Sequence, residues 1–66
     1  MSNPLAPYFE RTPTSGDLEA VANDELERII ASARDVEALG DADLTETRTW
    51  ATAVRVAAEA ALAART

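Results

Sequence analysis

The alanine-rich C-terminal segment, residues 44–65, constrains the fold more than any other part of the sequence. Its threonine-rich opening also suits a strand, but the alanine run at 57–64 decides for an α-helix because Ala is the strongest helix former. The polar side chains of the segment form one narrow stripe on a helical wheel, made of Arg48, Thr52, Arg55 and Glu59. One neighbouring helix cannot cover the wide apolar remainder, so we expect this helix to be contacted on two sides, as in a four-helix bundle made from two hairpins.

A second helix is expected at residues 23–39, after a separate short turn at 17–22. Apolar residues recur here at alternating spacings of four and three, which is the helical period. The stripe consists of Ala22, Leu26, Ile29, Ala33 and Val36, and it is widened by Leu18, Ile30 and Leu39. Asn23, followed by an acid-rich turn, is typical of an N-cap.

The connection between the two helices is only about four residues long. Gly40 is predicted to end the first helix in a left-handed conformation, and Asp43 with Glu46 matches the spacing of a capping box for the second. Connections this short place helices side by side and antiparallel. The predicted fold is therefore all-α: an antiparallel two-helix hairpin over residues 17–66.

Residues 1–16 carry all three prolines and are predicted to form an extended arm. The arm also contains Tyr8 and Phe9, and adjacent aromatic rings imply that it docks somewhere. Two alternatives stay open: the arm folds back over its own hairpin, or it reaches over a partner. The spacing of Pro4 and Pro7 also matches polyproline recognition motifs, but an arm kept extended and soluble by proline is the favoured explanation of so short a match.

The chain is acidic, with a formal net charge of −6. This argues against nucleic acid or an anionic membrane as partner, since both are bound chiefly through basic residues. The charge is uneven: residues 17–46 hold ten acids against two arginines, whereas residues 47–66 hold three arginines against one acid. The two halves are expected to attract each other modestly.

No chemistry of catalysis is suggested by the residue types present. The chain has no Cys, His or Lys, so only carboxylates remain as candidate bases, and pairs such as Asp35 with Glu37 are interpreted as a solvated helix face. Asp41 and Asp43 resemble the start of a calcium loop, but the position that requires Gly is Glu46. We expect no enzyme, no metal site and no cofactor.

The chain is short for a self-sufficient domain. It has 66 residues, fifteen of its 31 hydrophobic residues are alanine, and disulfides are excluded. Stability is therefore expected to depend on helix packing, with help from another chain. The first residues do not form a signal peptide and no apolar run reaches the ~20 residues of a membrane span, so a cytoplasmic location is expected.

These observations predict a non-enzymatic protein–protein interaction or oligomerisation module, a small structural or accessory subunit completed into a helical bundle by its own copies or by a partner. The alternative is an acidic regulatory protein, similar to an antitoxin or a DNA mimic, that blocks a basic surface on a target. Trp50 is either the centre of the hairpin core or an interface anchor. The predicted core and interface residues are Tyr8, Phe9, Leu26, Ile29, Ile30, Val36, Trp50, Val54, Ala57, Ala61 and Leu62.

Overall fold

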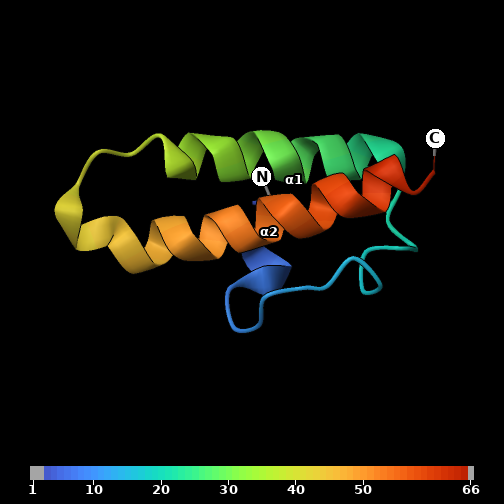
Figure 1. Ribbon diagram of the computed structural model, residues 1–66, viewed down its shortest axis with the longest axis horizontal. Coiled ribbons are helices and arrows are strands. Elements are labelled where there is room, and N and C mark those ends of the chain that lie inside the picture. Colours follow the sequence, from blue (N-terminus) through green and yellow to red (C-terminus); the bar gives the residue numbers. More distant parts are fainter. Residues whose placement is uncertain (1–2, 66) are drawn as a thin grey trace.

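The computed structural model describes residues 3–65, and its regular structure is entirely helical, with no strand in that range. Two 3-10 turns, η1 (Ala6–Tyr8) and η2 (Ala42–Leu44), accompany two α-helices, α1 (Asn23–Glu37) and α2 (Thr45–Ala63). The helices lie side by side and run in opposite directions, and the chain before α1 crosses over the pair (Figure 1). The all-α prediction is confirmed for the described residues.

The ends of α1 differ from the expected caps. The N-cap position is Ala22, which has no side-chain cap, and the amide oxygen of Asn23 instead accepts a hydrogen bond from Arg65 at 2.7 Å. The helix ends at Glu37, and Gly40 does not have a positive φ. The predicted Asn23 cap and the left-handed Gly40 are therefore wrong; polar groups from distant parts of the chain hold both ends.

The connection between α1 and α2 is held by different residues from those expected. The carboxylate of Asp41 accepts a hydrogen bond from the backbone N–H of Asp43 at 2.9 Å and caps η2. The guanidinium of Arg48 donates to the carbonyls of Leu39 and Asp41 at 2.9 and 2.6 Å. The predicted capping box of Asp43 and Glu46 is wrong, because the N-cap position of α2 is Leu44 and has no side-chain cap.

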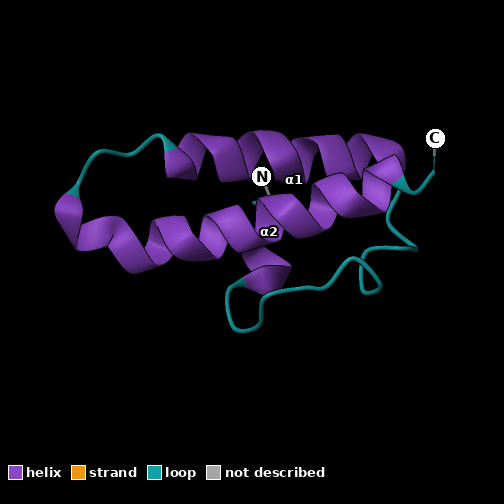
Figure 2. Cartoon of the chain, in the orientation of Figure 1, coloured by secondary structure: helices purple, strands orange, loops and turns teal. Residues whose placement is uncertain are grey.

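The N-terminal arm is folded rather than extended from residue 3 onward; residues 1 and 2 lie outside the described range. The side chain of Asn3 accepts from the backbone N–H of Leu5 at 2.9 Å, directly before the turn η1. A second turn begins where Asp17 accepts from the N–H of Thr14 at 2.9 Å, a bond that holds the pKa of Asp17 below its ordinary value. The predicted extended conformation is therefore wrong for this part of the arm, which packs back on the helices (Figure 2).

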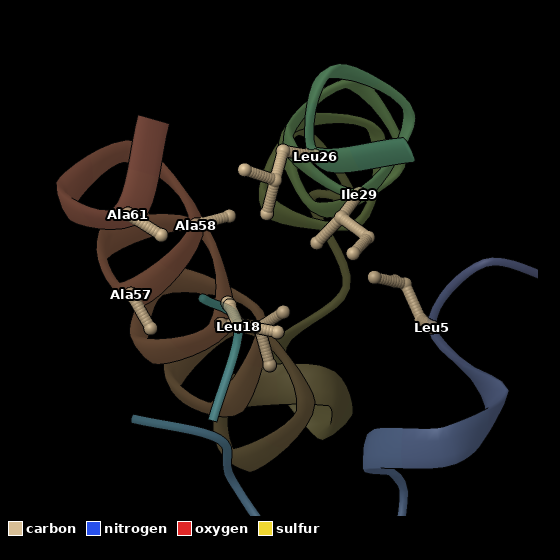
Figure 3. Close-up of a cluster of buried hydrophobic side chains, with 8 residues drawn as sticks. Leu5, Leu18, Leu26, Ile29, Ala57, Ala58 and Ala61 are labelled. Carbon is tan, nitrogen blue, oxygen red and sulfur yellow. The ribbon is translucent and has the colours of Figure 1, made fainter. Parts of the chain in front are cut away.

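The hydrophobic core lies where the arm meets both helices (Figure 3). Leu26 points from α1 toward the alanines of α2, whereas Ile29 points toward Leu5 and Leu18, which enter from the arm. Leu18 is fully buried and Leu5 is 2% exposed. Because the buried side chains of α2 are mostly methyl groups, the arm leucines supply much of the apolar volume of the core.

Candidate functional site

The predicted core and interface residues fall into three groups. Five are buried: Leu26, Ile29, Val54, Ala57 and Ala61. Five are partly buried and pack against the core: Tyr8, Ile30, Val36, Trp50 and Leu62. Phe9 is 59% exposed, so its ring is available at the surface.

Six further buried residues were not among these eleven, although Leu18 and Ala33 belong to the predicted helical stripe: Leu5, Pro13, Leu18, Ala33, Ala51 and Ala58. The alanines carried a signal, since Ala51 and Ala58 lie seven residues apart and flank Val54 at helical spacings. Leu5 and Leu18 carried a weaker one, because they are the aliphatic side chains that interrupt an otherwise polar and proline-containing stretch.

The polar stripe of α2 faces the C-terminal half of α1 and forms a cluster with it. Arg55 Nε donates to Glu37 Oε1 at 2.6 Å, and the hydroxyl of Thr52 donates to Glu37 Oε2 at 2.7 Å. Arg55 also pairs with Glu59, which in turn lies 3.6 Å from a guanidinium nitrogen of Arg34. The interpretation of Glu37 as part of a solvated face is therefore wrong: its side chain is 23% exposed and fully engaged.

The charges of this cluster stabilise each other. Hydrogen bonds from Arg55 and Thr52 hold the pKa of Glu37 below the ordinary glutamate value. Hydrogen bonds to Glu37 and Glu59 raise the pKa of Arg55. Glu37 and Arg55 are thus both charged at neutral pH, which suits a structural junction between the helices and not a group that exchanges protons.

An aromatic corner lies at the N-terminal end of α2, and we define it as Phe9, Glu46, Thr47 and Trp50. The rings of Phe9 and Trp50 have centroids 5.4 Å apart and are tilted by 51°. The indole N–H of Trp50 donates to the Tyr8 carbonyl at 2.8 Å, which fixes the orientation of the indole. Together these residues line an open hollow of about 370 Å³.

A second surface feature is a row of exposed residues along α2, bordered at Ala60 by the arm residues Ser15 and Glu19. We call it the α2 strip and define it as Thr49, Ala53, Val56 and Ala60, which recur at spacings of four, three and four. All four are exposed, Val56 by 54%. The strip has no charged residue, and this spacing is that of a narrow helix–helix seam.

The arginines and the acidic residues differ in how many of them form ion pairs or hydrogen bonds within the chain. Three arginines pair with carboxylates at 3.4–3.6 Å, Arg55 lies in the cluster above, and Arg48 and Arg65 donate to backbone carbonyls. Each of the six arginines therefore has a partner inside the chain. Eight of the twelve acids form no ion pair with another described residue: Glu10, Glu19, Asp24, Glu27, Asp35, Asp41, Asp43 and Glu46.

The described part of the chain contains neither a metal-binding cluster nor a membrane-spanning helix. Across residues 3–65 no three acidic side chains converge in a way that would hold a metal ion. Neither α1 nor α2 combines the length and the apolar character needed to cross a membrane.

Comparison with known proteins gives no match. No family model matches the chain, and no curated protein or solved structure is significantly similar to it. The aromatic corner, the α2 strip and the distribution of charge are therefore the features of the chain that bear on its function.

Proposed function

We propose that this chain is a non-enzymatic protein–protein interaction module, a small accessory or structural subunit that associates through α2. The observation that carries the proposal is the α2 strip, an uncharged row of exposed side chains along a helix whose opposite side is packed in the core. Placing such a row against another helix removes apolar surface from water without burying a charge.

The geometry of the strip favours a helix as the occupant. Its side chains are small, so the axis of a facing helix can approach to the lower end of the usual range, about 8 Å. In the proposed assembly the helical hairpin is completed into a bundle, either by a second copy or by a partner. The arm reduces what remains for that partner to cover, because Leu5 and Leu18 already bury the adjacent side of α2.

The proposal is tested by placing a charge in the strip. Val56→Lys replaces a residue that is 54% exposed in the single chain, so the fold is expected to persist while association is lost. Ala31→Lys, on the exposed side of α1, is the matched control because it adds the same charge away from the strip.

Light scattering after size-exclusion chromatography measures the outcome. We expect the unaltered chain and Ala31→Lys to exceed the monomer mass of 7.0 kDa at high micromolar concentration, and Val56→Lys to elute as a monomer. If the unaltered chain is monomeric alone, the same pair of variants is compared for binding to the protein that co-purifies with it. Equal binding by both variants refutes association through the strip.

A second candidate function is supported by the charge distribution. Eight acids without an ion pair, beside six engaged arginines, give the surface an acidic character that a basic protein surface would complement. An acidic regulator would bind its target with strong salt dependence. Changing Asp24 and Glu27 to their amides would then weaken binding and its dependence on salt, whereas association through the strip would be unaffected.

A further inference from the structure

We propose that the aromatic corner is a binding site for one cationic side chain, an arginine or a lysine presented by a partner protein. This rests on the proposed function in one respect, namely that the cation comes from a protein. The corner adjoins the N-terminal end of the α2 strip, because Glu46 and Trp50 lie three residues before Thr49 and Ala53. Val56, which tests the strip, lies ten residues after Glu46, so the two sites can still be tested with separate variants.

The two aromatic rings of the corner suit a cationic ligand. A cation is attracted to the face of an aromatic ring within about 6 Å, and Trp is the strongest such partner. Trp50 is held by its hydrogen bond to the Tyr8 carbonyl, and Phe9 lies against it with more than half of its surface exposed. The tilt between the rings prevents them from covering each other, which leaves aromatic surface facing the hollow.

The polar residues of the corner, Glu46 and Thr47, also suit a cationic ligand. Glu46 lies one helical turn before Trp50, so the two side chains share a face of α2. Its carboxylate forms no ion pair with any described residue, although it lines the same hollow as the rings. The hydroxyl of Thr47 provides a hydrogen-bond acceptor at the same hollow. A carboxylate beside two aromatic rings complements a positive charge on an apolar stem, as arginine and lysine carry.

The source of the cation follows from the arginines of this chain. A second copy offers no lysine, its Arg48, Arg55 and Arg65 are hydrogen-bonded within the chain, and two copies that each carry a net charge of −6 repel one another. A different protein with an exposed basic side chain has no such cost. We therefore assign the site to a foreign basic segment.

The test uses the full chain and two short peptides, acetyl-Gly-Arg-Gly amide and the same peptide with neutral citrulline in place of arginine. Trp50 is the one tryptophan of the chain, so its fluorescence and its indole N–H resonance report on the corner directly. We expect saturable millimolar binding of the arginine peptide and at least fivefold weaker binding of the citrulline peptide. Added salt weakens the former because the site is exposed.

Variants locate the response. Glu46→Gln and Phe9→Leu are each expected to weaken arginine-peptide binding about threefold, since each removes one attraction of the size measured at exposed sites. Asp35→Asn, which removes an unpaired acid on α1, is the control and is expected to leave binding unchanged.

Three outcomes overturn the proposal: no saturable change, equal binding of the two peptides, or an equal loss in Asp35→Asn and Glu46→Gln. A change in Trp50 emission on concentrating the protein alone, abolished by Glu46→Gln, would assign the corner to a second copy and overturn the foreign partner. If the arginine peptide does not bind but Val56→Lys still prevents association, only the proposed cation site is refuted. If the peptide binds but Val56→Lys does not change association, only the proposed association through the α2 strip is refuted.

Discussion

Val54 and Val56 offer an internal comparison of the packed and exposed sides of α2. They are the same residue type two positions apart, yet Val54 is fully buried and Val56 is 54% exposed. Changing either to Ala removes two methyl groups, worth about 1.6 kcal/mol when both are fully buried. The change to Ala also returns about 0.5 kcal/mol through helix propensity.

For Val54→Ala the cavity left in the core adds to the loss, so the free energy of unfolding is expected to fall by roughly 1.5–2.5 kcal/mol. For Val56→Ala the smaller loss of burial and the gain in propensity nearly cancel, and the change is expected to stay within about 0.5 kcal/mol. A chain of 66 residues has roughly 3–10 kcal/mol of stability in total, so the first substitution is a large fraction of it.

Urea unfolding followed by Trp50 fluorescence and circular dichroism measures both values. With a slope near 1 kcal/mol per molar, Val54→Ala is expected to lower the midpoint by about 2 M and Val56→Ala to leave it nearly unchanged. Equal losses at low micromolar concentration would refute the packing described for α2. A loss in Val56→Ala that appears only at high concentration would instead show that association covers Val56.

Three further predictions concern the arm and the interhelical cluster. Leu18→Ala is expected to lower the free energy of unfolding by about 2–5 kcal/mol in urea titrations. Leu39 is exposed, so Leu39→Ala is the control and is expected to lower it by less than about 1 kcal/mol. Equal losses would mean that the arm does not pack against the helices. Because the pKa of Glu37 is lowered in the folded state, its contribution to the free energy of unfolding is present above the ordinary glutamate pKa and is lost as the pH falls below that value. In Glu37→Gln the unfolding midpoint is therefore expected to depend less on pH in the acid range. A pH dependence equal to that of the unaltered chain would contradict this. Trp50→Phe keeps a ring but removes the hydrogen bond to the Tyr8 carbonyl and part of the packed indole, so a loss of about 1 kcal/mol or more is expected by circular dichroism, and unchanged stability would contradict this contact.

The helices were predictable because their apolar spacing follows the period of the α-helix. Leu26 and Ile29 lie on the predicted stripe and are buried, and α1 begins at Asn23 as expected. The α2 boundaries fall within two residues of the prediction, since a long alanine run leaves little competition from strand. Local patterns of this kind depend on nearby residues alone, and the sequence contains all of them.

The caps and the arm were not predictable, because they depend on residues far apart in the chain. The side chain of Asn23 accepts a hydrogen bond from Arg65, which lies 42 positions later, instead of capping the helix. Leu5 and Leu18 are buried in the same core as both helices, yet no periodic pattern marks Leu5, and Leu18 lies only on the flank of the predicted stripe. The aromatic corner has the same origin: Phe9 reaches Trp50 only because the arm crosses over the helix pair, so its sequence signal was two aromatic residues without a partner.

The arginines link the fold to the character of the surface. Those of the C-terminal half point back to the first half: Arg48 to the connection, Arg55 to Glu37, and Arg65 to Asn23 and the turn at Leu18. Each contact joins segments that the chain must bring together, so the positive charges of this half stabilise the fold and are not free for other contacts. The surface left to a partner then consists of acids without ion pairs, an uncharged strip on α2 and an aromatic hollow. A partner that matches all three presents an apolar helix and basic side chains together, and this combination distinguishes it from a nucleic acid or an acidic protein.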